Sequence, residues 1–209
     1  MTERRKKALL YIHGKGGSAA EAQRLGQNGL GFEAIGVDYQ ESLPWLVGKP
    51  LRAAYEEARQ KYAHVFVVAN SIGAYFAMHA LQHCQVERAL FISPVLDMER
   101  LILDMMGWAR VSEEDLREQG EIPTAFGETL SWEYLCYVRE HPIQWNVPTD
   151  ILYAGGDHLI SRHTVDAFVK THRARLTVME DGEHWFHTDK QLRFLDEWLK
   201  TALASPAKP

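Results

Sequence analysis

Three residues whose types act together in nucleophilic catalysis follow separate strand-like segments of this chain: Ser71, Asp157 and His184. A serine hydroxyl group becomes a strong nucleophile when a histidine removes its proton. A buried carboxylate on the other ring nitrogen fixes the tautomer of that histidine and stabilises its imidazolium form. If the three side chains meet, their chemistry predicts acyl transfer through a covalent intermediate on the serine.

Short apolar runs alternate with amphipathic segments along the chain. The runs predict strands at residues 8–12, 32–37, 64–69, 89–92, 150–154 and 175–179. The segments between them predict helices that begin near residues 18, 50, 71, 164 and 188. This alternation is typical of the α/β class, with a parallel sheet and helices on both faces. Ligands bind beyond the carboxyl ends of such strands, and the three candidate residues fall there.

The alternation is interrupted between residues 96 and 148. That stretch contains no clear strand, and its apolar spacing predicts two or three helices. We interpret it as a helical cap that is inserted into a single domain spanning residues 1–209.

The predicted strand ends carry glycine-rich or polar segments that resemble those of the α/β-hydrolase family. They are His13-Gly14-Lys15-Gly16-Gly17, Asn70-Ser71-Ile72-Gly73, Ser93-Pro94, Gly155-Gly156-Asp157-His158 and Gly182-Glu183-His184. The chain order Ser, Asp, His is also that of the family. The resemblance extends from Ala8 to about Leu203, and the family's first two strands are missing, as in its small members. It implies a three-layer sandwich with about six mainly parallel strands.

The segment Ala69-Asn70-Ser71-Ile72-Gly73 resembles the family's G-x-S-x-G turn from strand to helix. Small residues are needed on both sides of the serine because the backbones of the strand and of the helix nearly touch there. Gly73 fits the pattern, and Ala69 departs from it by one methyl group. The turn would place the N–H group of Ile72 at a helix N-terminus, facing a developing oxyanion. Taken alone, Ser71 fits an ordinary helix N-cap equally well.

The segment His13-Gly14-Lys15-Gly16-Gly17 resembles the family's oxyanion loop, which implies that the N–H group of Lys15 is the second oxyanion donor. Its glycines let the backbone approach a substrate closely. The same stretch also fits a relaxed dinucleotide-binding fingerprint, Gly14-x-Gly16-x-x-Ala19, with Asp38 about twenty residues further on. A nucleotide-binding oxidoreductase is therefore an alternative, although it explains none of the three candidate catalytic residues.

The acid and the histidine also occupy the positions that the family uses. Asp157 follows its strand through Gly155-Gly156, and His184 lies in a Gly-x-His loop before the last helix. The alternative for Asp157 is a cap on the following turn. Asp97, after the fourth strand, is the reserve candidate for the acid, because some hydrolases carry it there. His187 lies close to His184, and we interpret it as structural.

The resemblance implies a hydrolase that cleaves a carboxylic ester or thioester of a small-molecule acyl substrate and needs no cofactor or metal. Side chains at the strand ends and in the insertion are expected to line its pocket. These candidates are His13, Met105, Met106, Trp108, Trp132, Tyr134 and Trp185. They favour a modest, partly apolar acyl group, unless those in the insertion only pack it onto the sheet. A binding protein of the same fold, without catalysis, is the other alternative.

The bulk composition is that of an ordinary globular domain. The 209 residues are 46% hydrophobic and 24% charged, with a formal net charge of −5. The one basic run, at residues 4–7, is too short to predict nucleic-acid binding. No apolar run is long enough to cross a bilayer and no secretory signal is visible, so we expect a cytoplasmic protein. Cys84 and Cys136 are expected to be free, and the sequence does not indicate the oligomeric state.

Overall fold

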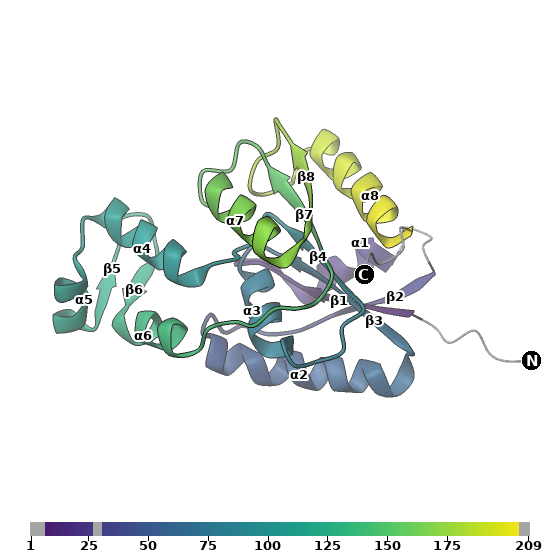
Figure 1. Cartoon of the computed structure of the whole chain (residues 1–209), viewed down its shortest axis with the longest axis horizontal. Coiled ribbons are helices and arrows are strands. Elements are labelled where there is room, and N and C mark those ends of the chain that lie inside the picture. The colour runs from purple at the N-terminus through teal and green to yellow at the C-terminus, as the bar shows by residue number, and fades with distance from the viewer. Residues whose placement is uncertain (1–6, 27–30, 205–209) are drawn as a thin grey trace, which may run out of the picture. The chain divides into compact units, whose positions relative to one another are not determined.

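Six strands form one fully parallel sheet in the computed structural model, which describes residues 7–26 and 31–204 (Figure 1). They are β1 (Lys7–Ile12), β2 (Phe32–Gly36), β3 (His64–Asn70), β4 (Arg88–Ile92), β7 (Thr149–Ala154) and β8 (Arg175–Met179). Every predicted strand is confirmed, with ends within one residue of those expected. The basic residues 4–6 lie outside the described residues.

The strand order, β2-β1-β3-β4-β7-β8, contains one change in the direction of winding. The chain runs from β1 outward to β2, returns past β1 to β3, and then proceeds through β4 and β7 to β8. Crossovers between parallel strands are right-handed, so this change places the helix after β1 on the opposite face from the helices after β2, β3 and β7. Ligands of such sheets bind at this switch, beyond the carboxyl ends of β1 and β3.

Helices cover both faces of the sheet, as the sequence predicts. One face carries the 3-10 turn η1 (Ala19–Glu21), α1 (Ala22–Gly26) and α8 (Asp189–Ala204), and the other carries α2 (Pro44–Lys61), α3 (Ile72–Leu81) and α7 (Arg162–His172). Thr188 begins α8 as expected, because its Oγ1 accepts a hydrogen bond from the N–H group of Gln191 at 3.3 Å.

Helix α2 begins earlier than the sequence predicts. A proline favours the first turn of a helix, and Pro50 marks the expected start, but Pro44 occupies that position instead. Pro50 lies inside the helix, where its missing N–H group leaves the carbonyl of Leu46 without a helical partner. Leu46 is exposed, so this turn of the helix lies at the surface, where a missing backbone hydrogen bond costs less than in the core.

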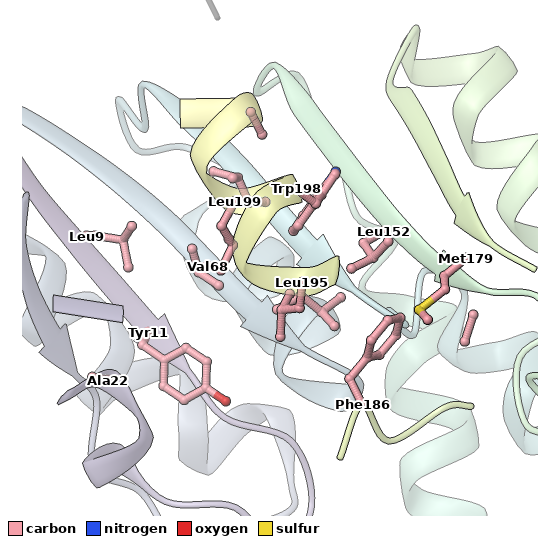
Figure 2. Packing of buried hydrophobic residues seen from close by; sticks show 14 residues of the cluster. Leu9, Tyr11, Ala22, Val68, Leu152, Met179, Phe186, Leu195, Trp198 and Leu199 are labelled. Atoms are coloured by element: carbon pink, nitrogen blue, oxygen red, sulfur yellow. The ribbon is translucent and has the colours of Figure 1, made fainter. Parts of the chain in front are cut away.

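Helix α8 packs its apolar stripe on the face of the sheet that α1 also covers (Figure 2). Leu195, Trp198 and Leu199 belong to one buried cluster with side chains from β1, β3, β4, β7 and β8. Burying each large apolar side chain contributes about 1.5–3 kcal/mol. Phe186, from the loop between β8 and α8, is buried in the same cluster. The loop that carries His184 is therefore anchored to the core two residues further on.

Residues Asp97–Ile143 form a compact unit of their own, separate from the unit that contains the sheet. It consists of α4 (Met98–Ala109), α5 (Glu113–Gln119), β5 (Glu121–Pro123), β6 (Thr129–Ser131) and α6 (Trp132–Glu140). The three helices agree with the expected helical pieces. The expectation of no strand is wrong, because β5 and β6 form an antiparallel hairpin. Strands of three residues are too short to give an alternating pattern in the sequence.

The two cysteines are unpaired, as the sequence predicts. Cys84 and Cys136 are both free thiols, and both are half-buried. Burial raises the pKa of the Cys84 thiol. Among the described residues, no helix combines the length and the apolar character needed to cross a membrane.

A buried ion pair connects the sheet to α8 at the amino ends of the strands. Arg88 and Asp150 are both almost fully buried, with Nε and Oδ2 3.6 Å apart, and Arg88 also donates to the carbonyl of Ala202. Burial lowers the pKa of Arg88, whereas the Asp150 carboxylate raises it. Asp150 also accepts two hydrogen bonds from Arg175. We expect Asp150→Ala to lower the free energy of unfolding by about 3–5 kcal/mol, because it removes both of these bonds together with the counter-charge beside the buried Arg88.

Urea denaturation of both proteins would measure this difference. Asp166→Ala is the matched control, since Asp166 pairs with Arg162 at 2.9 Å but both side chains are about half exposed. Asp166→Ala is expected to lower the free energy of unfolding by at most about 1 kcal/mol. Equal midpoints for the two variants would contradict a stabilising role for the buried pair.

Candidate active site

The three candidate catalytic residues lie beyond the carboxyl ends of three strands in the unit that contains the sheet. Ser71 follows β3, Asp157 follows β7 and His184 follows β8. The carboxyl ends of parallel strands lie along one edge of the sheet, so residues far apart in the sequence can meet there. Ser71 is also at the change in winding direction.

The turn at Ser71 is a sharp connection from strand to helix. β3 ends at Asn70, α3 begins at Ile72, and Ser71 between them has φ 52° and ψ −122°. A positive φ is uncommon for a residue with a side chain, and such backbone strain costs about 1–3 kcal/mol. Ser71 occupies the N-cap position of α3, but within the described chain its hydroxyl group makes no capping bond. The side chain is thus available for another partner.

A second turn, at Ser93, holds the strained backbone of Ser71. The N–H group of Ser71 donates to the carbonyl of Ile92 at 2.9 Å, and the N–H group of Val95 donates to the carbonyl of Ser71 at 3.0 Å. Ser93 lies between these partners, fully buried and with φ 41°. β4 and the turn that follows it therefore fix both peptide groups of the candidate nucleophile. The sequence marks this turn only by its Ser93-Pro94 pair, which predicts no role.

His184 contacts both of the other candidate residues. Its Nε2 is 2.9 Å from Ser71 Oγ, and its Nδ1 is 2.7 Å from Asp157 Oδ2. A carboxylate only accepts hydrogen bonds, so Nδ1 carries the proton and Nε2 presents a lone pair to the hydroxyl group. The side chain of Asp157 is fully buried and that of His184 is 25% exposed. This arrangement allows the imidazole to take a proton from Ser71 while the buried carboxylate stabilises the resulting charge.

The structure distinguishes between the two candidate acids. Asp157 Oδ1 accepts hydrogen bonds from the N–H groups of Leu159 at 2.8 Å and Ile160 at 3.0 Å, so this residue does cap the following turn. Its other oxygen is bonded to the imidazole. Asp97 instead caps α4, where it accepts a hydrogen bond from the N–H group of Arg100 at 2.9 Å. The acid that contacts the histidine is therefore Asp157.

The loops that carry the acid and the histidine are bonded to each other. The N–H group of Gly156 donates to the carbonyl of Gly182 at 2.9 Å, and that of Gly155 donates to the carbonyl of Met179, the last residue of β8, at 2.8 Å. A Cβ atom at Gly155 would lie 2.4 Å from the carbonyl oxygen of Glu180, so the close approach requires glycine. The buried Tyr153 hydroxyl group also donates to the carbonyl of Ile160 at 2.9 Å. Burial, and then the nearby Asp157 carboxylate, raise the pKa of Tyr153, so it stays protonated and keeps this bond.

The glycine-rich loop after β1 lies against Ser71. A Cβ atom at Gly14 would be 3.2 Å from the Cβ atom of Ser71. The loop turns back through a hydrogen bond from the N–H group of Gly17 to the carbonyl of Gly14 at 3.1 Å, and Gly16 has φ 73°. The segment that carries Lys15 thus reaches the candidate nucleophile from the neighbouring strand.

The two residues expected to donate to an oxyanion flank the serine from different segments. Ile72 is the first residue of α3, so its N–H group has no partner within the helix. Lys15 belongs to the loop that lies against Ser71. That these two N–H groups stabilise an oxyanion stays a prediction.

The elements after this loop bear on the dinucleotide alternative. The glycines are followed by the 3-10 turn η1, and the helix α1 begins only at Ala22. A dinucleotide fingerprint instead opens a helix directly at its glycines, with the pyrophosphate at the helix N-terminus. The geometry therefore gives this alternative little support.

The remaining predicted pocket residues differ in their surroundings. His13 is buried, its ring stacks on Tyr39 at 4.0 Å, and its Nδ1 is 2.8 Å from the carbonyl of Gly14. Its part in a pocket stays a prediction. Trp185 is 71% exposed beside His184 and stacks on His187 at 5.1 Å. The other candidates belong to the smaller unit, and their part in a pocket stays a prediction: Met105, Met106, Trp108, Trp132 and Tyr134.

In residues 7–26 and 31–204, no three His, Cys, Asp or Glu side chains are grouped as metal ligands. A hydroxyl nucleophile with an imidazole base needs no metal.

Gly73 is required by the close contact between α3 and the end of β1. A Cβ atom at this position would lie 2.4 Å from the carbonyl oxygen of His13 and 2.6 Å from that of Ile12. Gly73→Ala must push the helix away from the strand, and we expect it to lower the free energy of unfolding by about 1–3 kcal/mol. Thermal or urea denaturation would measure this loss.

The control for this variant is Gly107→Ala in α4, where an added Cβ atom meets nothing within 4 Å. Alanine there should stabilise the helix by about 0.5–1 kcal/mol. If both substitutions changed stability in the same direction, the steric argument for Gly73 would be wrong.

The chain has structural neighbours but no match at the level of sequence. No protein-family model matches it, and no curated protein matches it. It is similar to Est1E from Butyrivibrio proteoclasticus, with a TM-score of 0.76 and 16% identity over 97% of this chain and 88% of that chain. For the α/β hydrolase domain-containing protein 10 from mouse, the TM-score is 0.72, with 15% identity over 94% and 89%. For a soluble variant of monoglyceride lipase from Saccharomyces cerevisiae, the values are 0.65, with 13% identity over 98% and 88%.

These similarities extend over almost the whole of each chain, and they agree with the parallel sheet and its flanking helices. The chain therefore has the α/β-hydrolase fold.

Proposed function

We propose that this chain is a serine hydrolase that cleaves a carboxylic ester or thioester through an acyl-enzyme on Ser71. The observation that carries the proposal is the pair of hydrogen bonds at His184, 2.9 Å to Ser71 Oγ and 2.7 Å to Asp157 Oδ2. The strained turn supports it, because backbone strain of this kind concentrates at functional sites. The structural similarity to a monoglyceride lipase agrees with it.

The reaction begins when Ser71 Oγ attacks the carbonyl carbon and His184 Nε2 takes the hydroxyl proton. The carbonyl electron pair moves onto the oxygen, where the N–H groups of Lys15 and Ile72 stabilise the negative charge. The intermediate collapses, and the alcohol or thiol leaves with the proton from His184. Water then attacks the acyl-enzyme with the same histidine as base, which releases the acid and restores Ser71.

The acyl group is proposed to be modest in size and partly apolar. The exposed Trp185 beside His184 is the candidate contact within the unit that contains the sheet. One structure of Est1E, to which this chain is similar, holds ferulic acid, so aromatic acids belong in the test panel. A chain-length series of p-nitrophenyl esters together with methyl ferulate measures the preference. Equal kcat/KM for all of them would contradict a shaped acyl pocket.

A fluorophosphonate probe tests the proposal directly. Ser71 Oγ forms a bond to phosphorus, fluoride leaves, and His184 takes the hydroxyl proton. Intact mass should show one adduct per chain, and peptide mapping should place it on Ser71. The heat-denatured protein is the control and should not react. A native protein that stays unlabelled would favour the non-catalytic binding protein, and labelling at another serine would contradict the assignment of the nucleophile.

A further inference from the structure

The glycine-rich loop that carries Lys15 needs support from the residues around it. Three of its five residues, His13-Gly14-Lys15-Gly16-Gly17, are glycines, which restrict the backbone less than any other residue. An oxyanion donor must be held in place before the reaction to stabilise the transition state. The structure contains a buried hydroxyl group, that of Tyr39, bonded to the first residue of this loop, and a carboxylate, that of Glu21, next to its last residue.

Tyr39 supports the first residue of the loop. It is 8% exposed, and its hydroxyl group donates a hydrogen bond to the carbonyl of His13. Its ring also stacks on the His13 ring, with centroids 4.0 Å apart and planes 8° apart, and meets Phe76 edge-on. Both the backbone and the side chain of His13 are therefore held by one tyrosine.

Glu21 supports the other end of the loop from η1. Its Oε1 accepts a hydrogen bond from the N–H group of Ser18 at 2.8 Å, and its Oε2 accepts one from the hydroxyl group of Tyr11 at 2.5 Å. Tyr11 is 5% exposed in β1 and is part of the cluster beneath α8 (Figure 2). A Cβ atom at Gly17 would lie 2.7 Å from Glu21 Oε1, so the carboxylate lies directly against the loop.

The two tyrosines keep their protons for these bonds. Burial raises the pKa of Tyr11, and the hydrogen bond to Glu21 raises it further, while a hydrogen bond with Asn70 opposes this. Burial and then the charge of Glu21 raise the pKa of Tyr39. Both hydroxyl groups therefore remain donors at any pH at which the protein would be assayed.

We propose that Glu21 and Tyr39 are positioning residues that hold the loop so that the N–H group of Lys15 faces the oxyanion. Neither residue touches the substrate in this account, and each acts through the loop backbone. The inference rests on the proposed hydrolase function. It assigns roles to two residues outside the Ser71, His184 and Asp157 contacts.

Displacing the loop is expected to weaken binding of the transition state more than binding of the substrate, so that kcat falls and KM does not. Removing an oxyanion donor outright costs on the order of 10²–10³ in rate, so displacing one should lower kcat by about tenfold. Glu21→Ala and Tyr39→Phe should each have this effect with an unchanged KM, since the substrate carbonyl carries little charge before attack. Glu21→Gln should recover most of the rate, because its oxygen can still accept from Ser18 and its amide can donate to Tyr11.

A trifluoromethyl ketone provides a second readout. Ser71 Oγ adds to its carbonyl carbon, the π electrons move onto the oxygen, and the hydroxyl proton passes to His184. The adduct carries the oxyanion itself, so the inhibition constant should rise in each variant by the same factor by which kcat/KM falls. A residue that only stabilises the fold would not move these two quantities together.

Tyr55→Phe is the matched control for Tyr39→Phe. Tyr55 is also a buried tyrosine whose hydroxyl group donates to a backbone carbonyl, that of Gln85 at 2.7 Å, but it lies in α2 and not at the loop. This variant should lose stability without a change in kcat. The melting temperature of every variant is measured first, and kinetics are recorded well below the lowest one.

The outcomes separate the two proposals. Ser71-dependent turnover in the wild-type chain, with unchanged kcat and inhibition constant in Glu21→Ala and Tyr39→Phe, would overturn the positioning role alone. The positioning role would also be overturned if the two variants changed only KM, or if Tyr55→Phe lowered kcat as much as Tyr39→Phe does. Absence of Ser71-dependent turnover in the wild-type chain would overturn the hydrolase function and this inference with it.

Discussion

Ser71→Ala is expected to abolish ester hydrolysis, with a fall in kcat on the order of 10⁶-fold when the nucleophile of such a site is removed. The fold should persist, because the hydrogen bonds that hold residue 71 to Ile92 and Val95 come from its backbone. The hydroxyl group makes no capping bond to α3, so its loss leaves the helix start unchanged among the described residues. Release of p-nitrophenol from p-nitrophenyl acetate measures the rate, and the melting temperature measures the fold.

Ser112→Ala is a suitable control, since Ser112 caps α5 through a hydrogen bond to the N–H group of Asp115 at 3.1 Å. It should cost about 0.5–2 kcal/mol of stability and leave the rate unchanged. Hydrolysis by Ser71→Ala at the wild-type rate would show that another group is the nucleophile.

Asp157→Asn is expected to lower kcat by about 10⁴-fold at neutral pH while leaving the geometry of the site nearly intact. The asparagine oxygen can still accept from the N–H groups of Leu159 and Ile160, as Oδ1 does now. Its NH₂ group would then face His184 Nδ1, where only an acceptor fits the present tautomer. The proton must move to Nε2, and the imidazole can no longer accept the proton of the serine.

Steady-state kinetics of the same ester measure this effect, and Asp97→Asn is the matched control. Asp97 is the other acid that the sequence allows, but its side chain accepts from the N–H group of Arg100 and caps α4. A large rate loss in Asp97→Asn, with a normal rate in Asp157→Asn, would reverse the assignment of the acid.

The four inner strands of the sheet, β1, β3, β4 and β7, are predictable from the sequence because most of their residues are buried. β4 and β7 are buried at every position. Strands that are buried on both faces have continuous apolar runs, which are easy to recognise in a sequence. The hairpin of β5 and β6 is not predictable in this way, since each strand has only three residues. The start of α2 is ambiguous for a different reason: Pro44 and Pro50 both fit a first helical turn, and only the packed structure selects between them.

The supports of the site are less visible in the sequence than its reactive residues. Serine, aspartate and histidine at strand ends are recognisable because few residue types can perform this chemistry. Ser93, Glu21 and Tyr39 act through backbone groups of other residues, and many residue types can do that. Their roles therefore depend on which segments lie beside them.

The sequence by itself determined the strands, the class of fold, and the types and order of the residues that could react. Only the tertiary structure decided that the hydroxyl group of Ser71 is hydrogen-bonded to the imidazole of His184, 113 positions away in the sequence. It also decided that the acid on the other ring nitrogen is Asp157 and not Asp97, which caps α4. The physical reason is that a local sequence pattern indicates only which residues of a segment can be buried. Distances between segments follow from the winding order of the sheet and from contacts between loops, such as that between Gly156 and Gly182.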